Sequence, residues 1–238
     1  MESLAGAGWT GAMTTLVLGG NGKSGARVAA RLTERGVPVR IGSRSGDPAF
    51  EWADPSTWEP VLDGVDRVYV TYLPDLGFPG APETIGAFAK TAVAAGADRF
   101  VLLSGRGEKV AEESEEAAKA AGGDWTVVRA SWFNQNFSES FLLDSVRSGV
   151  LVLPGPPTRR EPFVDLEDVA DVAVAALTED GHAGRTYEVT NASSRTLAET
   201  AAVLGEVLGR DIRFAECTEE QYREALQAEG APAGFAVE

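Results

Sequence analysis

Short apolar runs alternate along this chain with longer stretches in which apolar residues recur every three or four positions. Runs of about four to six residues rich in Val, Leu, Ile and aromatic side chains are typical of buried strands. We expect strands at residues 14–18, 38–43, 67–71, 100–103, 125–129 and 187–190, and an extended segment at 150–153.

The intervening stretches have the spacing of helices that bury one face. In residues 85–93 the apolar positions fall at i, i+3, i+4, i+7 and i+8, which places them on one side of a helix. Asp165 precedes a similar stretch and is expected to act as its N-cap. We expect helices at residues 26–36, 56–62, 85–96, 111–121, 136–146, 166–177 and 196–208, and an amphipathic segment around Tyr222 and Leu226.

Strands that alternate with helices predict an α/β fold, a doubly wound parallel sheet. Parallel strands need crossover connections, and the crossover helices cover both faces of the sheet. Residues 1–12 have no apolar period and many small side chains, so we expect a flexible leader there. The charge run at residues 112–116 is expected to be the solvated face of a helix.

The segment 19–25, GGNGKSG, joins the first expected strand to the first expected helix. It fits the dinucleotide-binding pattern G-x-G-x-x-G from Gly20, and G-x-x-G-x-x-G from Gly19. Glycines allow a tight turn and close approach of a diphosphate, whose charge suits a helix N-terminus. The alternative is a plain strand–helix turn. We expect a dinucleotide held by Gly19, Asn21, Gly22, Lys23, Ser24 and Gly25.

The end of the second expected strand indicates which dinucleotide binds. An NAD site usually has Asp or Glu there, on the ribose 2′-hydroxyl. Residues 37–46, VPVRIGSRSG, contain no acid. Ser43 and Arg44 stand where a 2′-phosphate would lie, and a guanidinium can hold phosphate by paired hydrogen bonds. The sequence therefore favours NADP(H), with Arg44 as an ordinary exposed loop charge as the alternative.

Composition limits the classes of partner. The 238 residues include 21 Lys plus Arg and 36 Asp plus Glu, a net charge of −15, which argues against nucleic acid and anionic membrane surfaces. One Cys and one His exclude multi-cysteine and His-rich metal sites, and we expect no metal. Without a signal-like or membrane-length apolar run, we expect a cytoplasmic protein that acts on a small molecule. A homodimer is expected on frequency alone.

Several segments together are similar to a known family. TTLVLGGNGKSG, IGSR, LDGVDRVYV, LLSGRGE, VVRASWFNQNF and EPFVDLEDVADVAVAAL resemble the NmrA-like atypical short-chain dehydrogenase/reductases, particularly the branch with ergot-alkaloid iminium reductases. The resemblance spans about residues 13–215. It implies an NADP-binding Rossmann domain at residues 13–150 and a smaller substrate-binding part at 151–238, interleaved with the Rossmann core.

The resemblance also implies site residues at the ends of the third, fourth and fifth strands. It places Thr71, Tyr72, Pro74, Ser104 and Gly105 beside the cofactor. Ligands of open parallel sheets bind at this carboxyl edge in any case. The substrate pocket is expected to contain Trp132, Phe133 and Asn134, and the hydroxyls chosen for catalysis are those of Tyr72 and Ser131. Asn134 has the alternative role of fixing its loop.

One departure from ordinary short-chain dehydrogenases bears on the chemistry. Their Tyr-x-x-x-Lys pair protonates the substrate, but residues 108–121 contain no tyrosine. A ketone needs that proton, whereas an iminium, a quinone or a conjugated C=C group is already strongly electrophilic. We therefore expect an NADPH-dependent reductase of such an activated group. The alternatives are a non-catalytic NADP(H)-sensing regulatory protein and a non-redox enzyme of secondary metabolism.

Overall fold

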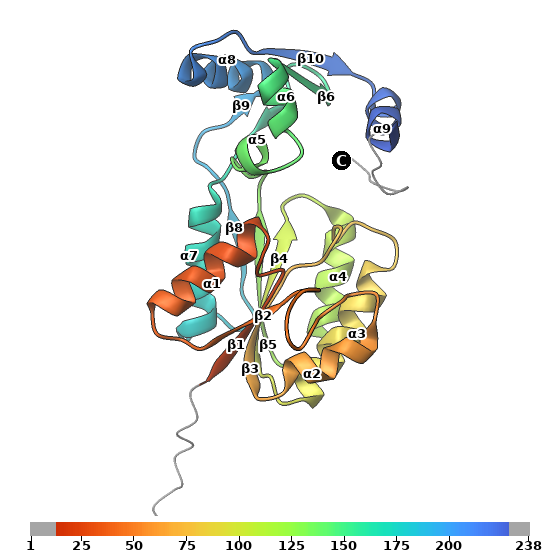
Figure 1. Cartoon of the computed structure of the whole chain (residues 1–238), viewed down its shortest axis with the longest axis vertical. Coiled ribbons are helices and arrows are strands. Elements are labelled where there is room, and N and C mark those ends of the chain that lie inside the picture. Colours follow the sequence, from red (N-terminus) through yellow and green to blue (C-terminus); the bar gives the residue numbers. More distant parts are fainter. Residues whose placement is uncertain (1–12, 229–238) are drawn as a thin grey trace, which may run out of the picture.

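The computed structural model describes residues 13–228, which form a layered α/β body and a smaller lobe beyond one end of its sheet (Figure 1). The expected leader, residues 1–12, and the last ten residues, 229–238, lie outside the described part. None of the helices between residues 13 and 228 combines the length and apolar character that a bilayer crossing requires.

Six strands form the central sheet, and every neighbouring pair is parallel. Their order across the sheet is β2-β1-β3-β4-β5-β8. This confirms the predicted doubly wound sheet. The strands are β1 (Thr14–Leu18), β2 (Val39–Gly42), β3 (Val65–Val70), β4 (Arg99–Gly105), β5 (Asp124–Ala130) and β8 (Thr186–Val189).

The first five strands, β2-β1-β3-β4-β5, follow the usual dinucleotide-binding order 3-2-1-4-5-6 without its outermost strand, and β8 is added beyond β5. No strand forms in residues 43–54, where the outermost strand would be built; Phe50 and Trp52 from this segment enter the core instead. The order reverses between β1 and β3, so a ligand crevice is expected beyond the carboxyl ends of these two strands.

Helices cover both faces of the sheet (Figure 1). On one face lie α1 (Lys23–Glu34) and α7 (Leu166–Thr178), which pack against each other. On the other lie α2 (Trp58–Leu62), after the short 3₁₀ turn η1 (Pro55–Thr57), with α3 (Ala81–Ala94) and α4 (Lys109–Lys119). The Asp165 side chain accepts a hydrogen bond from the Glu167 amide, as expected of the α7 N-cap.

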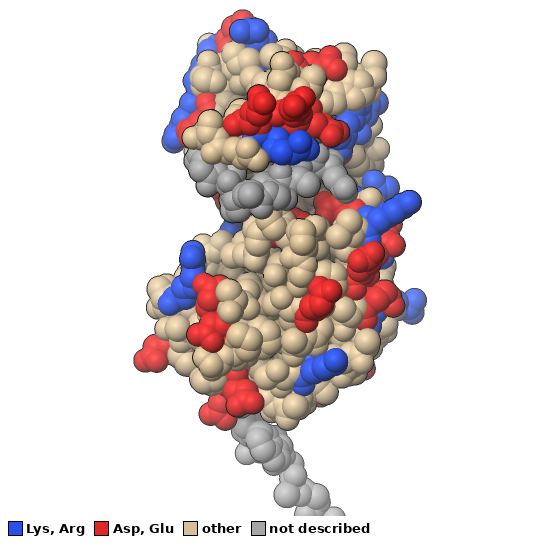
Figure 2. Space-filling model, turned by 90° about the vertical axis from the view of Figure 1, so that its right-hand side faces the viewer, with Lys and Arg blue, Asp and Glu red and all other residues tan. Residues whose placement is uncertain are grey.

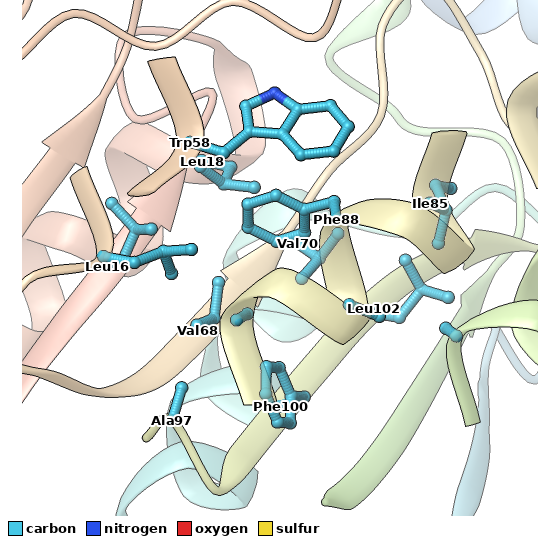
Figure 3. Close-up of a cluster of buried hydrophobic side chains, with 14 of the residues drawn as sticks. Leu16, Leu18, Trp58, Val68, Val70, Ile85, Phe88, Ala97, Phe100 and Leu102 are labelled. Atoms are coloured by element: carbon cyan, nitrogen blue, oxygen red, sulfur yellow. The ribbon is translucent and has the colours of Figure 1, made fainter. Parts of the chain in front are cut away.

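Successive strand residues point to opposite faces and so supply two separate cores. Leu16 and Leu18 of β1 face α2 and α3, whereas Val17 between them faces α1 and α7. Figure 3 shows the first core, in which the Phe88 ring of α3 lies between Trp58 and Val70. The Trp58 and Phe88 rings meet edge to face, with centroids 5.7 Å apart.

The smaller lobe has its own core and is interleaved with the sheet along the chain. Its first elements lie between the end of β5 and residue 150, within the range predicted for the Rossmann domain. Further along the chain, α7 and β8 return to the sheet. Figure 1 shows the lobe above the carboxyl edge of the strands. It consists of α5 (Asn136–Glu139), α6 (Leu143–Ser148), β6 (Val150–Pro154), β7 (Arg160–Glu161), β9 (Arg195–Thr196), α8 (Leu197–Leu208), β10 (Arg213–Cys217) and α9 (Glu219–Ala228).

Two local expectations are wrong. The single helix expected at 136–146 is divided into α5 and α6, because Ser140 adopts an extended conformation between them. The charge run at 112–116 is not wholly solvated, since Glu115 is completely buried. On the face drawn in Figure 2, acidic side chains gather on the small lobe, and basic side chains lie beside them and along the edges of the lobe.

Candidate functional site

The glycine loop after β1 forms a close-packed turn at the carboxyl edge of the sheet. Gly19 has a φ of +63°, a conformation that glycine adopts without strain. A Cβ atom at Gly25 would collide with the Gly19 carbonyl oxygen. The first turn of α1 therefore packs directly on the loop backbone, as a dinucleotide-binding turn requires.

The N-terminus of α1 is open to an anion. Its N-cap, Gly22, provides no side-chain cap, and the first turn contains no acidic residue. The first amide bonded within the helix is that of Ala26, which donates to the Gly22 carbonyl. The amides of Lys23, Ser24 and Gly25 precede it, so they have no partner inside the helix. This arrangement suits a diphosphate.

Lys23 connects the loop to the smaller lobe. Its ammonium donates to the Asn136 side-chain oxygen at 2.8 Å and lies 5.7 Å from the centre of the Phe133 ring. Burial lowers the pKa of Lys23 below its ordinary value, and the nearby Glu139 carboxylate offsets this only in part. The ammonium is held at the N-terminus of α1, where it adds a positive charge beside the expected diphosphate.

Ser43 and Arg44 follow β2 at the outer side of the loop. The Ser43 carbonyl accepts hydrogen bonds from the amides of Gly46 and Phe50, which fixes a tight turn. Arg44 lies in that turn with its side chain 85% exposed, and its Nε is 3.9 Å from the Glu51 carboxylate. Its guanidinium is thus available to a 2′-phosphate.

The residues after β3 line the same edge. The Thr71 hydroxyl donates to the Leu18 carbonyl at 3.1 Å and fits the space that a side chain at Gly19 would fill. Tyr72 is half-buried, with its ring edge to face on Trp52 at a centroid distance of 5.0 Å. Pro74 is exposed on the following loop.

The end of β4 differs from the expectation for a cofactor contact. The Ser104 hydroxyl is buried and donates to the Glu115 carboxylate at 2.7 Å. Arg129 makes a bidentate pair with the same carboxylate, at 2.9 and 2.8 Å, and this pairing raises the pKa of Arg129. The Ser104 side chain therefore serves the packing of α4, and Gly105 continues the strand beside it.

The segment after β5 distributes its side chains in different directions. The Ser131 hydroxyl is buried and donates to the Thr190 hydroxyl at 3.0 Å, beside β8. Trp132 packs in the small lobe against Phe141, whereas Phe133 packs under Lys23. Asn134 is exposed, and its amide donates to the Val164 carbonyl.

Several known proteins are similar to this chain in sequence or in structure. A comparison with protein-family models finds no match. Agroclavine dehydrogenase of Claviceps fusiformis is 30% identical over 242 residues, 94% of this chain and 84% of that protein. The (4-alkanoyl-5-oxo-2,5-dihydrofuran-3-yl)methyl phosphate reductase of Streptomyces griseus is 35% identical over 238 residues, 91% of this chain and 82% of that protein. The crystal structure of an NADPH-dependent quinone oxidoreductase from Escherichia coli, complexed with NADPH, superposes with a TM-score of 0.73 at 20% identity, over 94% of this chain and 85% of that one.

The chain belongs to the NmrA-like atypical short-chain dehydrogenase/reductase family. It is an oxidoreductase, and NADP(H) is the cofactor that these findings support. The glycine loop of this NmrA-like protein fits the diphosphate of NADP(H). The first amides of α1 have no partner inside the helix, and the loop has no space for a side chain at Gly25.

A cavity of about 580 Å³ lies in the small lobe of the NmrA-like protein. Asn134 lines it, but Trp132 and Phe133 do not. Trp132 lines a much smaller crevice instead. The three residues expected in one substrate pocket therefore do not share a cavity, and their role remains a prediction.

Sequence patterns did not predict the contacts of two polar residues of the NmrA-like protein. Glu115 was assigned to a solvated run, although its spacing from Ala111 and Ala118 places it on their buried face. Asn136 is separated from Lys23 by 113 positions, so no local pattern indicates their hydrogen bond.

Proposed function

We propose that this chain is an NADPH-dependent reductase that transfers hydride to an activated C=N, quinone or conjugated C=C group of a small organic molecule. The observation that carries the proposal is the open N-terminus of α1 above a glycine turn at the carboxyl edge of the sheet. The exposed Arg44 beside it supports the choice of the phosphorylated dinucleotide.

The chain's own residues would bind and orient the cofactor. The amides of Lys23, Ser24 and Gly25 would hold the diphosphate, with the Lys23 ammonium beside it. Arg44 and Ser43 would hold the 2′-phosphate. When bound, NADPH supplies the hydride that the acceptor carbon receives.

The proton donor of ordinary short-chain dehydrogenases has no counterpart on α4. Residues 108–121 contain no tyrosine. Lys119 is bound to Glu116 at 2.9 Å, and the neighbouring buried polar group is Glu115, which accepts hydrogen bonds from Ser104 and Arg129. A site built this way supplies no acid from α4, so an acceptor that is electrophilic without protonation suits it best.

Tyr72 is the hydroxyl we assign to the substrate. It is half-buried at the end of β3, and its ring is held against Trp52. Such a hydroxyl can donate to an oxygen on which negative charge develops, as in a quinone or a conjugated carbonyl compound. An iminium needs no such donor, because the hydride neutralises its positive charge.

The names of the relatives cover the same acceptor classes. The Streptomyces griseus name describes a furanone ring whose C=C group is conjugated with carbonyls. The Claviceps fusiformis protein is named for an alkaloid, and the Escherichia coli protein for quinones. These names support an activated acceptor for this chain.

The experiment that tests the proposal is a screen of NADPH oxidation with menadione, a cyclic iminium ion and an unsaturated lactone, run beside NADH. We expect turnover with at least one acceptor and a preference for NADPH. Activity on simple ketones that a single acid residue controls would contradict the mechanism. Tight binding of NADPH without oxidation by any acceptor would indicate the sensing protein instead.

A further inference from the structure

The cavity of about 580 Å³ belongs entirely to the small lobe. Every lining residue lies between positions 134 and 210, and the lining residues come mainly from α5, α6, α8 and the loop after β8. No residue of the glycine loop, nor of the ends of β2, β3 and β4, lines it. Its volume falls within the range of about 300–1,000 Å³ typical of small-molecule sites.

The walls of the cavity are mostly apolar. Eight hydrophobic residues form them on three helices and on the segment after β7, namely Phe137, Leu143, Val146, Phe163, Val203, Leu204, Val207 and Leu208. Val203, which is 41% exposed, stands at the same wall. Such a lining favours a hydrocarbon ligand, because its apolar surface would leave water on binding.

The charged groups of the lining are predominantly basic. Arg210 already donates to the carbonyls of Val146 and Arg147, and Arg147 pairs with Asp144 at 3.1 Å. The one carboxylate of the lining, Glu161, is paired with Arg159 at 2.6 Å.

Of the three arginines that line the cavity, Arg195 is the one available to a ligand. Within residues 13–228 it forms no ion pair with a carboxylate. Two carboxylates stand near it, and both have other partners. Glu161, which is opposite Arg195 in the β7–β9 pair, is bound to Arg159 at 2.6 Å, and Glu199 is held by Arg160 and by the Thr196 amide. In a chain of net charge −15, an unpaired guanidinium beside an apolar cavity is suited to an anion.

We propose that this cavity is an effector site for an organic anion with a hydrocarbon chain, such as a medium-chain carboxylate. The hydrocarbon chain of the ligand would lie among the apolar side chains, and its carboxylate would bind Arg195. The site does not depend on the proposed hydride transfer, since binding there can be measured without any cofactor.

Helix α5 connects this cavity to the cofactor loop. Phe137 lines the cavity. From the same helix, Asn136 accepts a hydrogen bond from Lys23, and Glu139 pairs with Arg27 at 2.7 Å, both residues of α1. A ligand that fixes α5 would therefore also support the N-terminus of α1. Coupling between two sites is reciprocal, so each ligand should tighten the binding of the other.

Calorimetry with octanoate, 1-octanol and acetate tests the site. We expect octanoate to bind more tightly than 1-octanol, and acetate not to bind measurably. Arg195→Gln should weaken octanoate at least tenfold and leave 1-octanol unchanged, whereas Val203→Trp should weaken both by obstructing the cavity. Arg213→Gln on β10, an exposed arginine outside the lining, is the matched control and should bind octanoate normally.

Three results would overturn the assignment. Equal affinities for octanoate and 1-octanol would show that the negative charge of the ligand does not contribute to binding. An Arg195→Gln variant that binds octanoate normally would show that Arg195 does not bind the carboxylate. Unchanged binding by Val203→Trp, with its thermal unfolding checked for an intact fold, would place the ligand elsewhere. The Kd for NADPH should fall at least fivefold under saturating octanoate, and an unchanged or raised value would overturn the coupling through α5.

Discussion

Arg44 owes its exposure to the turn that follows β2, in which two backbone amides converge on the Ser43 carbonyl. The turn fixes the backbone that carries the guanidinium, so only the side chain has to be ordered when Arg44 binds phosphate. Arg44→Ala should therefore raise the Kd for NADPH by about tenfold or more, since hydrogen bonds to charged groups contribute about 1.5–3 kcal/mol. The Kd for NADH should not change, and fluorescence titration with both cofactors measures the ratio.

A control for this change lies at the other end of α1. Arg35, at the C-cap, is 47% exposed and lies 4.0 Å from Glu179. Arg35→Ala removes the same charge from the chain but not from the turn after β2, so its ratio of NADPH to NADH affinity should equal that of the wild type. An unaltered ratio in Arg44→Ala would show that another group selects the phosphate.

Tyr72 offers a change that separates hydroxyl from ring. Tyr72→Phe keeps the edge-to-face contact with Trp52 and removes only the donor. We expect kcat with a quinone or an unsaturated lactone to fall by about 10²-fold, the lower end of the effect of a general acid. The rate with an iminium and the Kd for NADPH should not change. Equal losses for all acceptors would refute the assigned role.

Gly25 is a position where a single methyl group decides the structure. In Gly25→Ala the new Cβ would meet the Gly19 carbonyl, so α1 must move off the loop. We expect a loss of stability of about 1–3 kcal/mol, as for overpacked sites, together with loss of NADPH binding. Gly86→Ala in α3 meets Ala117 only at 3.4 Å and should keep both properties. Urea unfolding and NADPH titration measure them.

Residue patterns predict only part of this site. The glycine loop and Arg44 are recognisable because their neighbours in sequence define their setting. The partners of Ser104 and Lys23 are not, since both bonds form only after the sheet and lobe have assembled. The hydroxyl of Ser131 is likewise directed by Thr190, which lies directly after β8 and 59 positions further along the chain.

At the scale of elements, an ion cluster joins α1 to α5 and α7. Arg27 and Arg31 both bind the Glu167 carboxylate at 2.6 Å, and Arg27 also binds Glu139. Hydrogen bonds from Arg31 and Arg27 lower the pKa of Glu167 below its ordinary 4.5. A lowered pKa in the folded state means that the stabilisation is present above pH 4.5 and disappears as the pH falls through the lowered value.

Glu167→Gln tests this cluster. Its carboxylate is half exposed to solvent, so we expect a loss of about 0.2–1 kcal/mol at pH 7. This corresponds to a fall in Tm of about 0.4–4 °C for a chain of this size. The gap to the wild type should close on acidification and narrow in high salt. The exposed Glu206 of α8 supplies a control, and a gap independent of pH would exclude an electrostatic origin.

The pattern of apolar residues predicts the elements of the sheet better than those of the small lobe. Strands such as β3 and β4 are apolar on both faces because helices cover both, and this gives a strong signal. The short β7 and β9 and the mixed strand β10 carry exposed polar residues and were not predicted. They depend on pairing with distant segments rather than on local composition.

For the whole molecule, cofactor binding should appear as stability. A ligand that binds only the folded state at 100 times its Kd stabilises by about 2.7 kcal/mol. We expect NADPH at that excess to raise Tm by about 5–10 °C, and NADH at equal concentration to raise it less. Thermal unfolding followed by circular dichroism measures both shifts. Equal shifts would argue that the 2′-phosphate makes no contact.

The two parts of the molecule are threaded through each other. The chain leaves the sheet after β5, returns as α7 and β8, and leaves again after β8. A fragment ending at residue 150 would lose α7, whose Leu166, Val169 and Ala173 cover one face of the sheet, and would expose the edge of β5. The small lobe, which we expect to bind the substrate, therefore cannot be exchanged between relatives as one contiguous segment. New specificities have to arise by point changes within it, or by grafting two separate segments at once.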